Sequence, residues 1–359
     1  MPNVNESLLV KRLVASGPTR EVIEPFTGKH LYALLTSTEG DVDAAFQRAR
    51  SAQPGWSAMS LSSRCAVMLR FHDLLLENRH AGLDLVQQET GKARKDANEE
   101  VLDVCITARH YARDARRLLR PRRHLGAFPG LVGVTELRVP KGVVGVIAPW
   151  NYPLTLAISD AIPAMIAGNA IVLKPDLQTT LSALWIADLL AQAGLPEGVF
   201  TVVSGEGPVV GPWVIDRSDY VMFTGSTAVG RQVAQRCGER LIGCSMELGG
   251  KNAMIVRADA EPEWAASIAV RGSFSNSGQL CISMERIYVH ESEFEAFLAA
   301  FARRTEALRM SAHVGWGSDV GSLISEKQLD RVAAHVDDAV ERGASVVVGG
   351  KARPDVGPY

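Results

Sequence analysis

The middle of the chain alternates short apolar runs with longer amphipathic stretches. Ser182–Ala193 and Ala228–Cys237 repeat their apolar residues with the period of a helix. The runs between such stretches are almost wholly apolar, as expected for strands buried on both faces: Val143–Ala148, Ala170–Leu173, Val199–Val203 and Tyr220–Phe223. This alternation predicts a parallel sheet covered by helices, which is a doubly wound α/β fold.

The first 120 residues predict mostly helix. Asp41–Gln53, Ser60–Glu77 and Asp96–Leu119 each place their apolar residues on one helical face, and Gly91 follows a further helical stretch as its C-cap. Glycine and proline then interrupt a stretch rich in valine, threonine and leucine at residues 126–142. That composition predicts an exposed β-ribbon.

A second α/β region begins near residue 250. Its pattern predicts one strand and three helices: Asn252–Val256, then Glu261–Phe274, Glu293–Ala307 and 325–342. Ser325 stands three residues before Gln328, which is the spacing of a capping box, and Gly343 would end the same helix. A last strand-like run covers Ser345–Val348.

Composition and charge narrow the classes of function. The 359 residues suit two domains, and 47% hydrophobic with 22% charged residues is ordinary for a globular protein with a sizeable core. A formal net charge of −2 gives no electrostatic case for binding nucleic acid or an anionic membrane. The most apolar stretch, 161–173, is too short for a membrane span, and the N-terminus has no secretory pattern. We therefore expect a cytoplasmic protein without a nucleic-acid or membrane partner.

The cysteines and histidines show no metal-binding pattern. The five cysteines contain no C-x-x-C pair and the eight histidines no H-x-x-x-H pair, so we predict reduced thiols and no metal site. Four cysteines stand in apolar or helical contexts, whereas Cys281 follows the small, polar turn 274–280. A cysteine in such a turn can be exposed enough to act as a nucleophile, although a lone cysteine is usually a buried apolar residue.

Two further polar residues stand at strand ends. Asn151 lies between two prolines directly after the run 143–148, at the sheet edge where open α/β folds bind ligands. Its amide could stabilise a developing oxyanion, but a plain turn residue is the simpler explanation. Glu247 precedes paired glycines at the end of another apolar run. It could act as a general base, or it could be an ordinary carboxylate paired with Lys251.

Glycines near two strand ends would let a phosphate approach the backbone. In the segment Phe223–Gly230 a strand ends at Gly225 and a helix begins, so free N–H groups could face a pyrophosphate. The spacing is G-x-x-x-x-G rather than the dinucleotide fingerprint G-x-G-x-x-G, and a tight turn explains it equally well. Gly207 and Gly211 form a similarly weak pattern beside another strand.

Taken in order, the segments around Asn151, Gly225, Glu247 and Cys281 resemble the aldehyde dehydrogenase superfamily, and the resemblance covers nearly the whole chain. It implies that Cys281 is the nucleophile, Glu247 the general base and Asn151 the oxyanion-hole amide. It also implies residues that line the cofactor: Trp150, Asn151, Lys174, Pro175, Asp176, Leu177, Gly207, Gly211, Phe223, Gly225, Ser226 and Leu248.

The reaction that the resemblance implies is NAD(P)-dependent oxidation of an aldehyde to its acid, through a thiohemiacetal and a thioester on Cys281. Many NAD-preferring members carry a glutamate at the position of Leu177, where it would repel a 2′-phosphate. The leucine therefore favours NADP, with NAD as the alternative, and Lys174 could attract the phosphate. The segments are most similar to the actinobacterial succinate-semialdehyde dehydrogenase branch, so succinate semialdehyde is the expected substrate. Arg271 and Arg286 are candidates for binding its distal carboxylate, and another aldehyde is the alternative.

The fold that the resemblance implies has two parts. Residues 1–246 would form a Rossmann-like cofactor domain whose ribbon near 126–142 is an oligomerisation arm, and residues 247–359 an α/β catalytic domain. Full-length members continue past the equivalent of Tyr359, so we expect this catalytic domain to be truncated and the full-length protein to be a homo-oligomer. The alternative function is a catalytically silent fragment that binds a nucleotide or pairs with full-length subunits.

Overall fold

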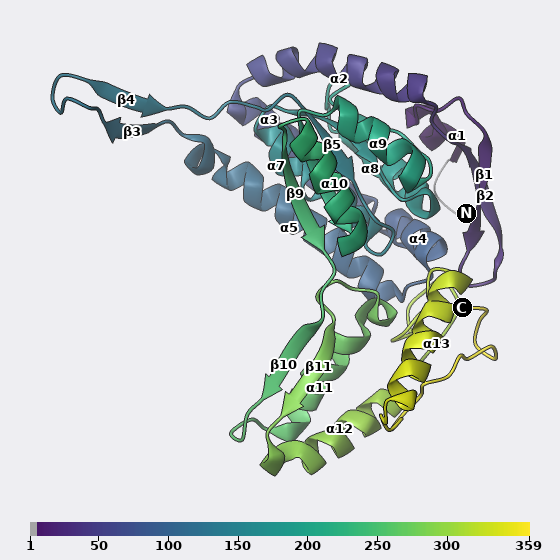
Figure 1. The fold of residues 1–359 in the computed structure, drawn as a ribbon. Coiled ribbons are helices and arrows are strands. Elements are labelled where there is room, and N and C mark those ends of the chain that lie inside the picture. Colours follow the sequence, from purple (N-terminus) through teal and green to yellow (C-terminus); the bar gives the residue numbers. More distant parts are fainter. Residues whose placement is uncertain (1–5) are drawn as a thin grey trace.

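Residues 6–359 are described by a computed structural model, in which a five-stranded sheet forms the centre of the larger region (Figure 1). The strands lie in the order β7-β6-β5-β8-β9, and all neighbouring pairs are parallel. Their bounds are β5 Val143–Ile147, β6 Ala170–Lys174, β7 Phe200–Val202, β8 Tyr220–Gly225 and β9 Gly243–Leu248. The predicted parallel sheet is confirmed.

Alternate side chains of the central strands enter two different cores. On β5, Val143 and Ile147 pack into one hydrophobic cluster, and Val144 and Val146 into another. This division follows from strand geometry, because successive side chains point to opposite faces. Helices cover both faces, which confirms the doubly wound arrangement. They are α2 Glu39–Ala58, α9 Gly207–Arg217 and α10 Thr227–Glu239 on one side, and α3 Leu61–Glu77, α4 Arg79–Thr90, α5 Arg94–Leu119, α6 Pro153–Ile158, α7 Ala161–Ile166 and α8 Thr180–Gln192 on the other.

A buried carboxylate joins two of these helices. Glu89 of α4 accepts hydrogen bonds from the backbone N–H groups of Leu181 (2.9 Å) and Ser182 (3.0 Å), in the first turn of α8. Glu89 therefore caps α8 from another helix, since those N–H groups have no partner within α8. Burial raises the pKa of Glu89 to about 7, although these hydrogen bonds act in the opposite direction.

The first 120 residues contain a hairpin that the hydrophobic pattern did not predict. Its antiparallel strands are β1 Thr19–Glu24 and β2 Lys29–Leu35. Gly28 in the connecting turn has a φ of +67°, a conformation that glycine adopts without strain. The strands fully bury only Val22, Tyr32 and Leu34, so their period-two signal is short. The prediction of mostly helix was wrong over these residues for that reason.

The remaining helical predictions for this region are confirmed. Helices α2, α3 and α5 each contain or nearly match their predicted stretch. Helix α4 ends at Thr90, and its C-cap is Gly91, as predicted, with a φ of +72° in the left-handed region. A short helix and a 3₁₀ turn precede the hairpin, and their bounds are α1 Glu6–Leu9 and η1 Val10–Arg12.

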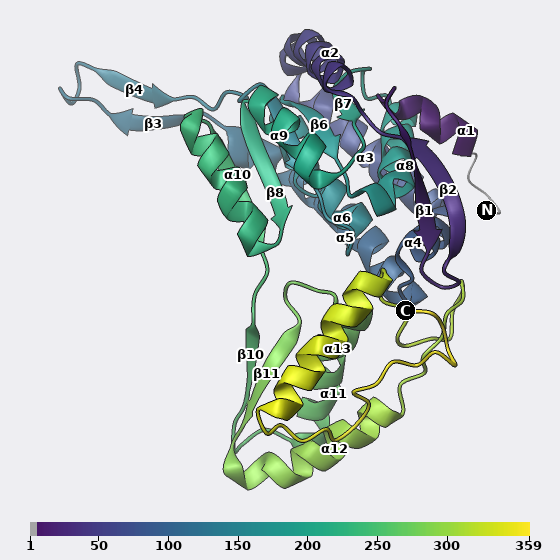
Figure 2. The same ribbon diagram turned by 45° about the vertical axis from the view of Figure 1, so that its right-hand side comes forward.

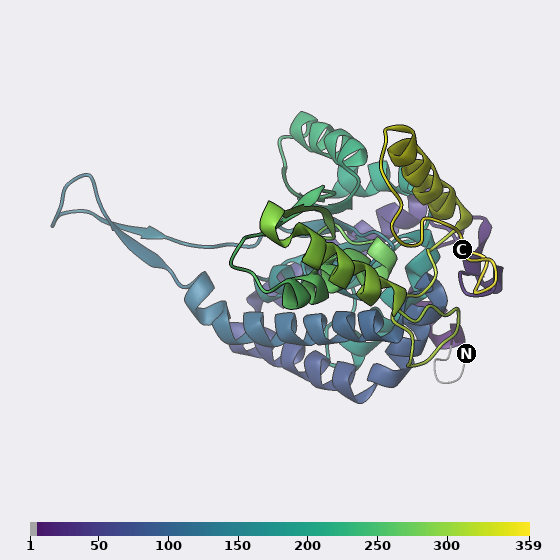
Figure 3. The ribbon, with the colours of Figure 1, turned by 90° about the horizontal axis from the view of Figure 1, so that it is seen from below.

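A two-stranded ribbon projects from the body of the molecule (Figure 3). Its antiparallel strands are β3 Arg122–Leu125 and β4 Gly133–Glu136. The ribbon was predicted near 126–142, and that range contains its turn and β4, but β3 begins earlier, separated from the end of α5 by two residues. Both faces of β3 are exposed, so no hydrophobic alternation marks its start. Leu125 and Leu131 are each 87% exposed at the end of this arm.

The second region is smaller and is joined to β9 through residues 249–251 (Figure 2). Its strands are β10 Asn252–Val256 and β11 Met284–Val289, which are parallel, and its helices are α11 Pro262–Phe274, α12 Phe294–Glu306 and α13 Glu326–Glu341. Its 3₁₀ turns are η3 Ser275–Gly278 and η4 Glu291–Glu293, whereas η2 Leu177–Thr179 lies in the first region, between β6 and α8. The strand and the three helices predicted here are confirmed.

Two details predicted for the second region are wrong. Ser325 is the N-cap of α13, but its side chain makes no capping hydrogen bond, so the capping box does not form. The run Ser345–Val348 is not a strand, and Val346 and Val347 are more than half exposed. An isolated extended segment needs a partner strand to satisfy its backbone, and β10 and β11 pair only with each other. Gly343 follows α13 with a φ of +95°, as predicted.

Candidate functional site

The carboxyl ends of β5 and β8 form the edge at which the predicted site residues gather. The chain leaves β5 towards β6 and β7 and later returns to the other side of β5 as β8, so the strand order reverses there. Ligands of open α/β sheets bind at such a reversal, outside the carboxyl ends of the strands. Asn151 follows β5, and Gly225 closes β8. Glu247 on β9 lies in register with Thr224, at the same end of the sheet.

The loop that carries Cys281 has a constrained backbone. Asn276, Ser277 and Gly278 have consecutive φ values of +51°, +57° and +77°, in the left-handed region. This conformation costs about 1–2 kcal/mol for a residue with a side chain, so surrounding contacts must hold it. One such contact is made by Ser277, whose Oγ donates to the carbonyl of Gly321 at 3.0 Å. Further along the loop, the amide of Asn252 donates to the carbonyl of Cys281 at 2.7 Å. The thiol of Cys281 is exposed, as a nucleophile requires.

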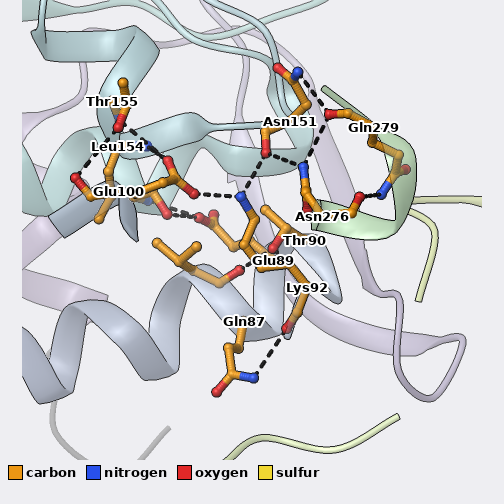
Figure 4. Close-up of polar contacts among 12 residues, drawn as sticks. Gln87, Glu89, Thr90, Lys92, Glu100, Asn151, Leu154, Thr155, Asn276 and Gln279 are labelled. Carbon is orange, nitrogen blue, oxygen red and sulfur yellow. Dashed lines mark hydrogen bonds and ion pairs between the residues drawn. The ribbon is translucent and has the colours of Figure 1, made fainter. Parts of the chain in front are cut away.

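Asn151 is connected to this loop through side-chain amides (Figure 4). Asn151 Nδ2 donates to the carbonyl of Gln279 at 3.0 Å, two residues before Cys281. In return, Asn276 Nδ2 donates to the carbonyl of Asn151 at 2.9 Å and to that of Gln279 at 3.1 Å. One N–H of the Asn151 amide is therefore engaged, and this bond fixes the direction of the other.

Tyr152 places a second side chain near the thiol. Burial raises the pKa of its hydroxyl above the ordinary value, and the nearby negative charges of Asp96, Glu100, Glu99 and Cys281 raise it further. Tyr152 is therefore a neutral hydroxyl at any physiological pH. Its ring is covered by the ammonium of Lys92, 4.0 Å from the ring centroid, in a cation–π contact.

Glu247 is exposed and does not form the ion pair considered in the sequence analysis. Lys251 pairs with Glu285 instead. The charge of Glu247 acts on a carboxylate that the sequence analysis did not single out, Asp160, which lies half-buried between α6 and α7. Burial is the main cause of the raised pKa of Asp160, and Glu247 adds to it. Two carboxylates therefore share this part of the site.

The predicted cofactor residues line the same edge. Gly207 begins α9 and Gly211 is buried one turn later, yet a methyl group added at either would meet no atom within 4 Å. Space for a ligand therefore lies against both glycines. At Gly225 an added methyl would lie 2.6 Å from the Phe223 ring, so glycine is required by packing. Ser226 caps α10 by accepting from Val229 N at 3.4 Å, so the helix begins where a pyrophosphate was expected.

The remaining predicted cofactor residues differ in exposure. Lys174 is buried at the end of β6, and its Nζ donates to the carbonyl of Pro175 at 2.9 Å. Burial lowers the pKa of Lys174, while Asp176 and Glu206 oppose this effect. Asp176 caps the turn η2 by accepting from Gln178 N at 3.0 Å. Leu177, the first residue of that turn, and Leu248, at the end of β9, are half-buried. These residues lie at or just after the carboxyl ends of β6 and β9.

The two arginines considered for a substrate carboxylate are both engaged. Arg271 forms an ion pair with Glu99 at 2.9 Å, and Arg286 donates to the carbonyl of Lys251 at 2.7 and 3.0 Å. Among residues 6–359, no group of three or more histidine, cysteine, aspartate or glutamate side chains is arranged to hold a metal. Over the same residues, no helix combines the length and hydropathy needed to cross a bilayer.

Comparisons with known proteins give the family of the chain. A family model described as the aldehyde dehydrogenase family matches residues 13–359. A Mycolicibacterium smegmatis protein with the provisional name succinate-semialdehyde dehydrogenase, NADP(+), is 52% identical over 340 residues, which are 95% of this chain and 66% of that protein. This chain thus spans about two thirds of that relative's length.

Solved structures resemble the chain over nearly all its residues. An E. coli structure described as an NADP dependent enzyme has a TM-score of 0.93 at 30% identity, covering 99% of this chain and 76% of that one. A succinate-semialdehyde dehydrogenase from Burkholderia pseudomallei has a TM-score of 0.90 at 30% identity, covering 94% and 70%. Sequence and fold agree, and the chain belongs to the aldehyde dehydrogenase family.

Proposed function

We propose that this chain carries the catalytic groups of an NADP-linked aldehyde dehydrogenase that oxidises succinate semialdehyde to its acid. The observation that carries the proposal is the hydrogen bond from Asn151 Nδ2 to the carbonyl of Gln279, because it brings an amide donor to the loop of an exposed cysteine. The names of the relatives support both the substrate and the choice of NADP over NAD.

In the proposed mechanism the Cys281 thiolate forms a bond to the aldehyde carbon, and the carbonyl π electrons move to oxygen. The second N–H of the Asn151 amide stabilises this oxyanion in the thiohemiacetal. The nicotinamide cofactor, when bound, supplies the acceptor for the hydride that leaves as the thioester forms. Glu247 then removes a proton from water, which adds to the thioester and releases the acid and the Cys281 thiolate.

The cofactor would lie along the carboxyl edge of the sheet. Gly207 and Gly211 leave open space for its phosphates, and the segment Lys174–Leu177 would face its adenosine ribose. Leu177 has no charge to repel a 2′-phosphate, in contrast to a glutamate at that position. The buried Lys174 adds positive charge near the same segment. These features support NADP, with NAD as the alternative.

A different aldehyde is the second candidate substrate. Both Arg271 and Arg286 are held by other groups, and the charge of Glu247 lies near enough to Asp160 to raise its pKa further beyond the effect of burial. A substrate with a distal carboxylate gains nothing from such surroundings, whereas a neutral aldehyde is not repelled.

The test is the Cys281→Ala variant, with Cys105→Ala as the control because Cys105 is buried within α5. We expect Cys281→Ala to lose aldehyde-dependent formation of reduced cofactor while its affinity for NADP stays within about twofold. Comparing kcat/KM for succinate semialdehyde and butanal, with NADP and with NAD, separates the two candidate substrates and cofactors. Unchanged turnover in Cys281→Ala would contradict the proposal, and a parent protein that binds NADP without turnover would favour the silent fragment.

A further inference from the structure

A lysine that the proposed mechanism does not use is completely buried beneath the site. Lys92 follows Gly91 at the end of α4, and its side chain has an exposed fraction of 0%. An ammonium group removed from water costs several kcal/mol unless it is paired and hydrogen-bonded. Here Nζ donates to Glu100 Oε1 at 2.5 Å and to the carbonyl of Asn151 at 2.7 Å, and it faces the ring of Tyr152.

Glu100, the ion-pair partner of Lys92, binds the backbone that follows Asn151. Glu100 Oε2 accepts from the backbone N–H groups of Leu154 at 2.8 Å and Thr155 at 3.2 Å. These groups belong to the first turn of α6, which begins two residues after Asn151. Negative charge at a helix N-terminus is stabilising, and the side chain of Glu100 is wholly buried. The Lys92–Glu100 pair therefore binds the segment that carries the amide at both of its ends.

The carbonyl of Asn151 is where this buried pair meets the Cys281 loop (Figure 4). It accepts from Lys92 Nζ on one side and from Asn276 Nδ2 on the other. Asn276 also binds the carbonyl of Gln279, which in turn accepts from Asn151 Nδ2. Without Lys92 the Asn151 carbonyl would lose one of its two hydrogen-bond donors. The bonds that remain, through Asn276 and the Gln279 carbonyl, lead to the side-chain amide of Asn151, so that amide would be held less firmly.

We propose that Lys92 is a positioning residue for the oxyanion amide of Asn151: by binding the Asn151 carbonyl and, through Glu100, the start of α6, it aims Asn151 Nδ2 at the Cys281 loop. This inference rests on the proposed function, since it assumes that Asn151 stabilises an oxyanion. Lys92 touches neither the thiol nor the reacting carbon, and it acts only through Asn151.

The test compares Lys92→Met with Arg64→Met. Arg64 is also a buried cation that binds backbone carbonyls, at Ile166 and Ser57, but it contacts none of the site residues. For Lys92→Met we expect kcat to fall about 10–100-fold, less than the loss of a whole oxyanion donor, with NADP affinity within about twofold. The rate of Cys281 alkylation by iodoacetamide should also stay within about twofold, because that reaction builds no oxyanion. Arg64→Met should reduce the folded fraction without this selective loss of kcat.

A double-mutant cycle with Asn151→Ala separates this inference from the proposed function. If Lys92 acts through Asn151, adding Lys92→Met to Asn151→Ala lowers kcat no further. Independent, multiplying losses would overturn the inference, as would parental kcat in Lys92→Met. An Asn151→Ala variant with parental kcat would instead overturn the oxyanion role in the proposed function. If Lys92→Met fails to fold, adding Glu100→Gln removes the buried charge that Lys92→Met leaves unpaired on Glu100, and the same loss of kcat is expected in the double variant.

Discussion

The two regions of this molecule differ sharply in how much apolar surface they bury. The first region buries large side chains on both faces of its sheet, among them Trp56 and Phe71 in one cluster and Phe46 and Phe223 in the other. The second region has a core of six residues, four of them alanines: Val256, Ala265, Ala266, Ala269, Phe297 and Ala300. Helix α13 buries none of its residues. Because buried apolar area is the main source of stability, the first region is expected to be much the more stable.

This difference bears on the site, because the regions contribute different groups to it. Asn151, Lys92 and Glu100 belong to the well-packed region, whereas Cys281 and its loop belong to the thinly packed one. The loop is held to the first region by Asn276 and Gln279. The geometry between amide and thiol is therefore determined mostly by the first region and transmitted through side-chain amides.

The largest expected effect comes from truncating a core phenylalanine in each region. Phe71 is 0% exposed, and Phe71→Ala should lower the free energy of unfolding of the first region by about 3–5 kcal/mol. Phe297→Ala should leave that transition unmoved and shift only an earlier one, because the second core is small. Urea unfolding followed by amide hydrogen exchange measures both transitions. A single transition displaced equally by both variants would mean that the two regions unfold as one unit.

A smaller change in the free energy of unfolding is expected when Asp96, the carboxylate next to the buried Lys92, is replaced. Burial raises the pKa of Asp96 to about 6, and Lys92 only partly opposes this. The folded state thus holds the proton more tightly than the unfolded state, and stability falls as pH rises from about 4 through about 6. Asp96→Asn removes this penalty, so it should equal the parent below about pH 4 and exceed it by about 2–3 kcal/mol at pH 8.

Urea unfolding of the first region at the two pH values checks this expectation. Asp96→Asn less stable than the parent at pH 8 would show that the Asp96 carboxylate is needed to neutralise Lys92. In that case Lys92 would depend on two carboxylates rather than on Glu100 alone.

The smallest change in the free energy of unfolding is expected from a substitution in α13. Val340 is 46% exposed, so Val340→Gln should change the free energy of unfolding by no more than about 0.5 kcal/mol. The same substitution at Val233 of α10, which is 5% exposed, buries an amide and should cost at least about 2 kcal/mol. Thermal unfolding of the two variants tests the contrast between the helices. Equal losses would show that α13 is covered in solution.

The spacing of apolar residues was sufficient to predict most strands and helices of the first region. The strands β5, β6, β7 and β8 and the long helices follow from apolar runs and a 3.6-residue period. The hairpin β1–β2 and the start of the ribbon were not predictable in this way, because few or none of their side chains are buried. A pattern of burial cannot mark an element that buries almost nothing.

The site could be predicted only in part. The residues at strand ends, such as Asn151 and Glu247, follow from the rule that ligands bind at the carboxyl edge of the sheet. Lys92 could not be found this way, since it lies 59 residues before the carbonyl that it binds. Asn276 carries a weak signal, because asparagine tolerates a positive φ in a turn, but its bond to Asn151 depends on how the regions pack.

The cap that Glu89 places on α8 has a consequence for a chain emerging from the ribosome. Glu89 and Ser182 are separated by 93 residues, which take about 5–20 s to synthesise at 5–20 residues per second. During that interval α4 exists without the helix it caps. The apolar faces of α3 and α5 likewise have no sheet to pack against until β5 and β6 are made. Early folding of this protein therefore waits on translation, and until β5 and β6 are made these apolar helix faces are open to aggregation.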